Sequence, residues 1–265
     1  MTGSPWIETP SALRSAYEEF DWVLAHEYEG HSVVHRLERG GVPELFAKTA
    51  EVGHYPSLQA EAERLRWAGA YLPVPEVVAS GADGPVEWLI TSALGGRDAT
   101  HPDLRRDPSA LTRILARGLR RFHDSTPVDD CPFDFRLPAA IGHVRARFAA
   151  GLIDAERDFH EEFAHLTPSG AVGLLESTHP QSEDLVVCHG DYCLPNILIE
   201  DGRATGYIDL GELGVADRWW DLAVATWSLT WNLGPGHEER FLEEYGAARD
   251  DERVRFYRLL YDLAC

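Results

Sequence analysis

A strand–loop–hairpin pattern between residues 185 and 211 constrains the fold of this chain more than any other segment does. Short apolar runs predict three strands, and an acidic, glycine-containing turn joins the last two; these strands cover residues 185–188, 197–199 and 204–208. The letters HGDYCLPN fill the loop between the first two strands, and Asp209 follows the third strand. Because a hairpin reverses the chain, Asp209 can return to the neighbourhood of that loop.

The polar side chains of this segment have the chemistry needed to hold a hard cation. Asp191 lies in the loop, Asn196 lies five residues later, and Asp209 follows the hairpin. An amide oxygen and a carboxylate oxygen that converge favour Mg²⁺, which keeps several waters and takes further ligands from substrate phosphates. We therefore predict that Asn196 and Asp209 bind magnesium and that Asp191 faces a substrate hydroxyl as catalytic base. Taken singly, each could be an ordinary turn residue.

Only one of the 24 basic residues is a lysine, Lys48. Residues 33–37 and 44–49 predict a hairpin that ends near this lysine, and residues 57–67 predict the helix that follows. Glu61 lies in the apolar stripe of that helix, where an unpaired carboxylate is costly. We therefore expect Glu61 to pair with Lys48. The alternative is a glutamate whose carboxylate reaches the surface.

The predicted strands and helices divide the chain into two parts. Residues 1–93 combine strands with one helix, and a strand at residues 86–91 leads into a crossing of small residues and glycines. Residues 94–265 are mostly helical, and the hairpin is their main β structure. We predict an α+β, bilobal fold with a small antiparallel-sheet N-terminal lobe and a mostly helical C-terminal lobe.

Composition excludes several classes of protein. A formal net charge of −20 argues against a nucleic-acid binder with a basic footprint, and it suits either a solvated surface or a polycationic ligand. No apolar run approaches the roughly 18 residues of a membrane span, and the acidic start does not match a secretion signal. Four cysteines without a CxxC pair predict free thiols in the cytoplasm. We expect a small-molecule partner; the oligomeric state stays open.

The motifs resemble the aminoglycoside phosphotransferase family, which is related to protein kinases. The pattern HGDxxxxN at residues 189–196, followed by IDxGxxGxxDxxxDLA from residue 208, carries most of the resemblance. The supporting strings are FAK at 46–48, LPVPEVV at 72–78, DCPFD at 130–134, AGLID at 150–154 and RFYRLLYDL at 255–263. The match is strongest to the 3′-phosphotransferases (kanamycin and neomycin kinases) and extends over nearly the whole chain.

The resemblance implies a protein-kinase-like fold with a nucleotide-binding lobe at residues 1–93 and a catalytic and acceptor-binding lobe at residues 94–265. It implies that the γ-phosphoryl group of ATP moves, with Mg²⁺, to a hydroxyl of an aminoglycoside antibiotic, which confers resistance. Asp191 matches the catalytic base, and Asn196 and Asp209 match the magnesium ligands. The implied cofactor-binding residues are Ser32 in a phosphate-covering loop at residues 29–32, Lys48, Glu61, and the hinge residues Ser92 and Ala93.

The acceptor side departs from the family pattern. Glu212 replaces an arginine of the family, and the family's antibiotic-binding positions hold Trp227, Ser228, Trp231 and Tyr261. The acidic residues that the resemblance still implies as acceptor-binding are Glu161, Glu162 and Asp262. Because of these departures, three alternatives stay open: a kinase of another small hydroxylated or amino-sugar metabolite, a non-catalytic nucleotide-binding relative, and a metal-dependent hydrolase.

Two further polar residues of the central motif are assigned structural parts. His189 directly precedes the catalytic loop, and Asp221 lies in the DLA string that closes the motif. Neither has a separate chemical task in phosphoryl transfer. We therefore predict that both order the loop around Asp191.

Overall fold

The computed structural model describes residues 7–28 and 32–264. It contains two compact units: Met1–Gly95 with Gly206–Gly211 form the first, and Gly96–Thr205 with Glu212–Cys265 form the second. Residues 29–31, where the resemblance places most of a phosphate-covering loop, lie outside the described residues.

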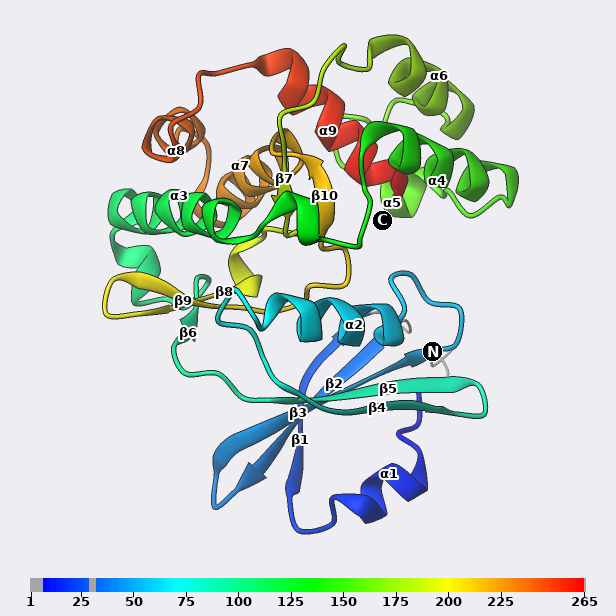
Figure 1. The fold of residues 1–265 in the computed structure, drawn as a ribbon, viewed down its shortest axis with the longest axis vertical. Coiled ribbons are helices and arrows are strands. Elements are labelled where there is room, and N and C mark those ends of the chain that lie inside the picture. Colours follow the sequence, from blue (N-terminus) through cyan, green and yellow to red (C-terminus); the bar gives the residue numbers. More distant parts are fainter. Residues whose placement is uncertain (1–6, 29–31, 265) are drawn as a thin grey trace. The chain divides into compact units, whose positions relative to one another are not determined.

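The first unit is a five-stranded antiparallel sheet with a helix on each face (Figure 1). Its elements are α1 (Ser11–Ala16), β1 (Asp21–Tyr28), β2 (Ser32–Arg39), β3 (Val42–Glu51), α2 (Leu58–Ala68), β4 (Val77–Asp83) and β5 (Val86–Ser92). The strand order is β1-β2-β3-β5-β4. Helix α2 packs on β3, β4 and β5. Leu13 of α1 packs with Leu37, Ala47 and Ile90 in an apolar cluster.

Alternation along β3 decides which side chains reach α2. Ala47 joins the apolar cluster on the α1 side of the sheet, so the next residue, Lys48, points to the other face. Helix α2 begins after Ser57, whose hydroxyl accepts a hydrogen bond from the Ala60 amide at 3.1 Å. The helix buries one stripe of side chains against the sheet, and Glu61 belongs to that stripe.

The second unit is mostly helical (Figure 1). Its helices are η1 (Leu104–Arg106), α3 (Pro108–Ser125), η2 (Val128–Asp130), α4 (Leu137–Ala149), α5 (Ala155–Asp158), α6 (Pro168–Thr178), η3 (Leu194–Asn196), α7 (Trp219–Leu233), α8 (Glu238–Tyr245) and α9 (Asp251–Ala264). Its strands are β6 (Arg97–Asp98), β7 (Leu185–Cys188), β8 (Ile197–Glu200), β9 (Arg203–Tyr207) and β10 (Gly214–Asp217). Helices α7 and α9 pack together, as do α3 and α8.

The predicted α+β fold with an antiparallel-sheet N-terminal part and a helical C-terminal part is confirmed. The hairpin β8–β9 turns at Asp201 and Gly202, both at positive φ, as a tight two-residue turn requires. The end of β9 belongs to the first unit, where the Tyr207 amide donates to the Pro73 carbonyl at 3.0 Å.

Four strands were not predicted from the sequence: β1, β4, β10 and the two-residue β6. Strand β1 has no clean alternation of buried and exposed residues. Strand β4 contains the weakly β-forming letters SGA, and a Cβ at Gly81 would lie 2.7 Å from the Trp88 ring, so a glycine is needed there. Strand β10 is only four residues long and follows the glycine-containing motif directly. Strand β10 pairs with β7 and strand β6 with β8, so both depend on partners distant in the chain that local spacing does not reveal.

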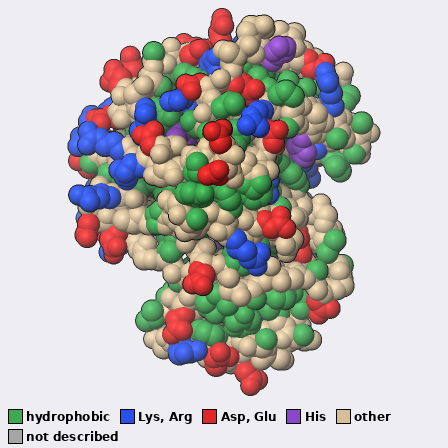
Figure 2. Space-filling model, in the orientation of Figure 1, with side chains coloured by type: hydrophobic (Ala, Val, Ile, Leu, Met, Phe, Trp, Pro, Cys, Tyr) green, Lys and Arg blue, Asp and Glu red, His purple; other side chains and the backbone are tan. Residues whose placement is uncertain are grey.

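Charged side chains of both signs are interspersed on the face drawn in Figure 2. Neighbouring opposite charges pair on the surface, as in Arg145–Glu176 at 2.7 Å and Arg120–Asp124 at 2.8 Å. The acidic excess therefore forms no single patch on that face. Within residues 7–28 and 32–264, no helix is both long enough and apolar enough to cross a membrane.

Candidate active site

Lys48 is the centre of a charged cluster in the first unit. Its ammonium lies 2.9 Å from Glu61 Oε2 and 2.6 Å from Asp209 Oδ1. The predicted Lys48–Glu61 pair is therefore confirmed, and the return segment after β9 adds a second carboxylate. Two carboxylates around one ammonium leave a net negative charge, which favours a further cation.

The two carboxylates set the charge state of Lys48. Burial lowers the pKa of this ammonium, but the charges and hydrogen bonds of Asp209 and Glu61 outweigh burial and raise the pKa above its usual value. The raised pKa favours the charged form of Lys48. A charged point donor suits phosphate oxygens.

The backbone conformation at Asp209 determines the direction of its carboxylate. Asp209 has φ of 62°, a conformation that few residues other than glycine adopt. Two residues later, a Cβ at Gly211 would lie 2.4 Å from Pro56 Cγ, so this position accepts only glycine without a shift of the chain. The Asp209 side chain is 43% exposed while it holds Lys48. A carboxylate that is both anchored and solvent-accessible has the chemistry of a magnesium ligand.

Asp191 and Asn196 meet in the loop of the second unit. The Asn196 amide nitrogen donates to Asp191 Oδ2 at 2.8 Å and to the Asp191 carbonyl at 3.0 Å. Because the nitrogen is used in this way, the amide oxygen of Asn196 is the atom that can ligate a cation. Tyr261, from α9, donates its hydroxyl to Asp191 Oδ1 at 3.1 Å. Both carboxylate oxygens of Asp191 are thus held by donors.

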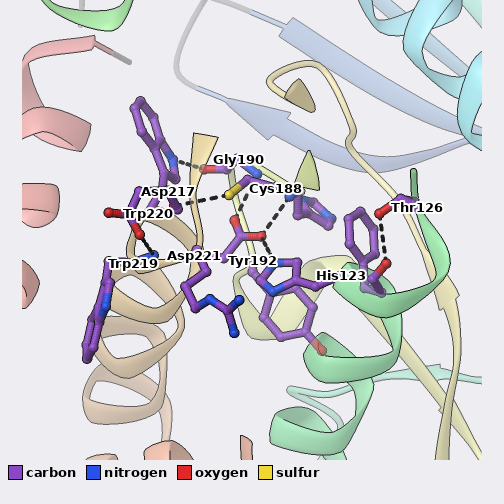
Figure 3. Close-up of polar contacts among 12 residues, drawn as sticks. His123, Thr126, Cys188, Gly190, Tyr192, Asp217, Trp219, Trp220 and Asp221 are labelled. Carbon is purple, nitrogen blue, oxygen red and sulfur yellow. Dashed lines mark hydrogen bonds and ion pairs between the residues drawn. The ribbon is translucent and has the colours of Figure 1, made fainter. Parts of the chain in front are cut away.

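Asp221 organises the chain immediately before Asp191 (Figure 3). Its carboxylate accepts hydrogen bonds from the His189 amide at 2.7 Å and the Gly190 amide at 3.0 Å. The Trp220 indole donates to the Gly190 carbonyl at 2.7 Å. Gly190 itself has φ of 93°, and a Cβ there would lie 2.5 Å from Glu212 Cβ. The predicted loop-ordering part of Asp221 is confirmed by these contacts.

His189 contributes to the same order. Its Nδ1 lies 3.3 Å from the Asp191 amide, and the side chain is buried. At this distance the ring nitrogen accepts from the backbone of the catalytic loop. The contact agrees with the predicted structural part of His189.

A buried group of His123, Cys188 and Asp221 brings three potential metal-ligand atoms within 4.8 Å of one another (Figure 3). His123 Nε2 lies 2.9 Å from Asp221 Oδ2, and its Nδ1 lies 2.8 Å from the Tyr245 hydroxyl. The Cys188 thiol donates to a backbone carbonyl at 3.3 Å, and burial raises the pKa of this thiol. These hydrogen bonds explain why the three side chains lie close together. The group is a buried hydrogen-bond network next to the loop that begins at His189.

Replacing this carboxylate (Asp221→Asn) is expected to lower the free energy of unfolding by about 2–3 kcal/mol. The new amide nitrogen would face backbone amides that need an acceptor, and Asp221 is fully buried. Urea unfolding followed by circular dichroism measures the change. The exposed Asp124 is the matched control: Asp124→Asn should change the free energy by no more than about 0.5 kcal/mol. Equal unfolding midpoints for the two variants would contradict the assignment.

Comparison with known proteins shows the family to which a chain with these residues belongs. A family model described as "Phosphotransferase enzyme family" matches residues 24–257. The chain belongs to this phosphotransferase family.

Individual members of the family are similar over nearly their whole length. An aminoglycoside 3′-phosphotransferase of Streptomyces fradiae is 42% identical over 264 residues, which cover 94% of this chain and 97% of the relative. The crystal structure of an aminoglycoside-3′-phosphotransferase of type VIII has a TM-score of 0.85 and 38% identity, covering 95% of this chain and 96% of that one. The structure of an aminoglycoside phosphotransferase of Streptomyces rimosus with ADP and streptomycin has a TM-score of 0.80, 29% identity and 96% coverage of both chains.

Of the cofactor residues implied by the family, Ser32, Ser92 and Ala93 lie at strand ends of the first sheet. Ser32 opens β2 and is buried. The Ser92 amide donates to the Glu76 carbonyl at 2.9 Å, and the Ala93 amide donates to the Glu44 carbonyl at 2.9 Å. These two N–H groups are therefore engaged within the lobe, and the carbonyl oxygens of the hinge are the better candidates for contact with a base.

The acidic candidates for the acceptor have different surroundings. Glu161 is exposed. Glu162 faces Arg258 at 3.4 Å and Arg255 at 3.9 Å. Asp262 is buried, and both of its carboxylate oxygens bond to His160, through the backbone amide at 2.9 Å and Nδ1 at 2.5 Å. In this structure the Asp262 oxygens face His160, and the assignment of Asp262 to the acceptor stays a prediction.

Tyr261 and His160 make contacts that the sequence did not reveal. Tyr261 was identified only as a missing acid, yet it bonds to Asp191. His160, which the sequence analysis did not single out, joins Asp262 to the tryptophans of α7. The only available signal was that Tyr261 and Asp262 adjoin in the C-terminal helix, and spacing alone does not show which of them faces the loop.

Proposed function

We propose that this chain is an ATP- and Mg²⁺-dependent phosphotransferase that phosphorylates an aminoglycoside antibiotic at its 3′-hydroxyl, which confers resistance. The observation that carries the proposal is the pairing of Lys48 with both Glu61 and Asp209 in a member of the phosphotransferase family. The 42% identity to an aminoglycoside 3′-phosphotransferase supports the acceptor class. We assign nucleotide binding to residues 1–93 and acceptor binding to residues 94–265, in the cytoplasm, where ATP is present.

Each site residue has one task in the proposed reaction. Lys48 donates to phosphate oxygens of the nucleotide, and Glu61 keeps the ammonium in place. Ser32 and the hinge residues Ser92 and Ala93 complete the nucleotide contacts. The amide oxygen of Asn196 and the carboxylate of Asp209 would hold Mg²⁺, which supplies positive charge to the phosphates when bound.

Asp191 handles the proton of the acceptor. It orients the attacking hydroxyl and accepts its proton while the new oxygen–phosphorus bond forms and ADP leaves. Its carboxylate is held by Asn196 and Tyr261 before any ligand arrives, so no reorganisation of the base is needed. Positioning of this kind supplies most of the catalysis where the transition state is loose.

A second candidate is a kinase of another hydroxylated or amino-sugar metabolite. It is favoured by the acceptor side, where Asp262 is buried under His160 and Glu162 is close to two arginines. Fewer unpaired carboxylates weaken the attraction for a molecule with many ammonium groups. Assays with acceptors that carry few amino groups distinguish an aminoglycoside kinase from a kinase of another metabolite.

The purified protein, ATP and MgCl₂ are incubated with kanamycin, neomycin and a panel of amino sugars. We expect a mass gain of one phosphate on an aminoglycoside, with the phosphoryl group at the 3′ position by NMR, and resistance in cells that express the protein. Phosphorylation of amino sugars alone would favour the second candidate. Nucleotide binding without any product would favour a non-catalytic relative.

A further inference from the structure

A pocket of about 290 Å³ lies in the second unit, between α3 and the β8–β9 hairpin. Four of the seven residues that line it are arginines: Arg113, Arg117 and Arg121 of α3, and Arg203 of β9. We call these four residues the basic pocket. None of them is assigned above to the nucleotide, the magnesium ion or the catalytic base, so the pocket has no part in the proposed reaction.

The charge around the basic pocket is opposite to that of the whole chain. The chain has a formal net charge of −20, yet α3 carries four arginines and one acid, Asp124. Asp124 pairs with Arg120, at 2.8 Å, and Arg120 does not line the pocket. Basic side chains gather over α3 and the hairpin at the left edge of Figure 2. A local excess of positive charge in an acidic protein attracts anions to that place.

Glu244 of α8 holds two of the four pocket arginines in place. Its Oε1 lies 3.4 Å from Arg113 Nε, and its Oε2 lies 3.0 Å from Arg117 Nη2. Arg240 approaches the same carboxylate at 4.0 Å, so one negative charge faces three guanidinium groups. Because a guanidinium has five N–H donors, contact with one shared carboxylate leaves donors of Arg113 and Arg117 for a ligand. Their head groups are therefore positioned before a ligand binds.

The other two pocket arginines have no acidic partner. In the part of the chain that the structure describes, neither Arg121 nor Arg203 forms an ion pair; Arg121 Nη2 donates only to the Ala204 carbonyl, at 3.5 Å. Both side chains are exposed, and so are the acids of the hairpin turn, Glu200 and Asp201, which do not pair with them. Two cations that line one pocket without an acid repel each other, and an anion between them removes that repulsion.

The donors and the size of the pocket indicate the class of anion. The planar fork of a guanidinium matches two oxygens of a phosphoryl group, and several forks around one cavity favour more than one such group. A volume of about 290 Å³ is near the lower end of the range for small-molecule sites. An extended polyanion would also meet the repulsion of a chain with a net charge of −20. A compact anion fits both observations.

We propose that the basic pocket binds a small anion with two or more phosphoryl groups. Its oxygens accept hydrogen bonds from Arg121 and Arg203, and from the N–H groups of Arg113 and Arg117 that Glu244 leaves available. The anion thereby bridges α3 and the β8–β9 hairpin. This binding site is separate from the proposed nucleotide site, which depends on Lys48 and Mg²⁺.

Titration calorimetry with sodium pyrophosphate in the presence of EDTA tests the proposal, because chelation removes metal-dependent binding at the nucleotide site. We expect one pyrophosphate per chain, bound more tightly than inorganic phosphate and more tightly than citrate at equal ionic strength. Citrate offers carboxylates in place of phosphoryl groups, so equal binding of citrate would contradict the proposed class of anion. Absence of pyrophosphate binding at millimolar concentrations would overturn the site itself.

Variants test whether the pocket arginines hold the anion. Combining Arg121→Ala with Arg203→Ala should weaken pyrophosphate binding at least about tenfold, because it removes the two cations without an acidic partner. Combining Arg121→Lys with Arg203→Lys keeps the charges but not the forks, so it should recover only part of the loss. Arg120→Ala is the matched control on the same helix and should change the Kd less than about twofold. Equal losses in the control and the alanine pair would show a general effect of charge and would overturn the pocket.

Hydrogen exchange locates the anion without any substitution. Pyrophosphate should slow amide exchange in α3 and in residues 200–204, because a ligand that bridges two elements suppresses their local opening. Slower exchange confined to the strands and helix around Lys48 would place the anion in the nucleotide site and overturn the proposal.

Discussion

Replacing Asp191 with alanine is expected to reduce turnover by about 10²- to 10⁴-fold, the range associated with loss of a general base. The carboxylate accepts from Asn196 and Tyr261, which orient it before the acceptor binds. Without it, the acceptor hydroxyl has no partner for its proton as the oxygen–phosphorus bond forms. Rates of ADP release with saturating kanamycin and ATP measure the loss, and calorimetry with ATP and Mg²⁺ should show that the nucleotide still binds.

Two comparisons make the Asp191 experiment specific. Asp124→Ala removes an exposed carboxylate that pairs with Arg120 on α3, and it should leave turnover unchanged. Asp191→Asn keeps the shape of the side chain but cannot take a proton, so it should be about as impaired as the alanine variant. Wild-type turnover in either Asp191 variant would remove this residue from the role of base.

Replacing Lys48 produces the second large effect. Lys48→Met leaves Glu61 buried without its partner, and it should lower the free energy of unfolding by about 3 kcal/mol. Lys48→Arg keeps the charge but replaces a compact ammonium with a planar fork, so kcat/KM for ATP should fall at least about tenfold. Urea unfolding and initial rates at varied ATP concentration measure the two effects separately.

A double-mutant cycle measures the interaction energy between Lys48 and Glu61 apart from their contacts with other residues. If Lys48 and Glu61 stabilise each other, Lys48→Met with Glu61→Gln should be less destabilised than the sum of the single variants, by about 0.5–3 kcal/mol. Strict additivity would contradict a direct interaction. An Lys48→Arg enzyme with wild-type kcat/KM would show that the only lysine of the chain is incidental to catalysis.

Local patterns allowed much of the Lys48 cluster and the hairpin beside it to be predicted. Glu61 shares a helical stripe with apolar residues, and a buried carboxylate needs a cation, which pointed to Lys48 on the preceding strand. The hairpin β8–β9 was predictable because its turn letters demand positive φ at Asp201 and Gly202. Both inferences use periodicity and backbone chemistry, which act over a few residues.

The contacts of Tyr261 and Asp262 were less predictable because they join distant parts of the chain. Tyr261 meets Asp191 seventy residues away, and Asp262 meets His160 at a separation of 102 residues. Adjacent residues of one helix face different neighbours, so the choice between Tyr261 and Asp262 depends on how α9 packs against α7. Spacing within a motif does not contain that information.

The amino-acid sequence by itself determined the α+β class, the order of the phosphotransferase motifs and the expected pairing of Lys48 with Glu61. The tertiary structure alone decided that Asp209 joins the Lys48 cluster from the return segment, and that Asp262 lies buried behind His160. The difference has one physical reason. Hydrogen-bonding and apolar periodicity are local properties of the chain, whereas a contact between side chains on distant elements is set by which elements pack together.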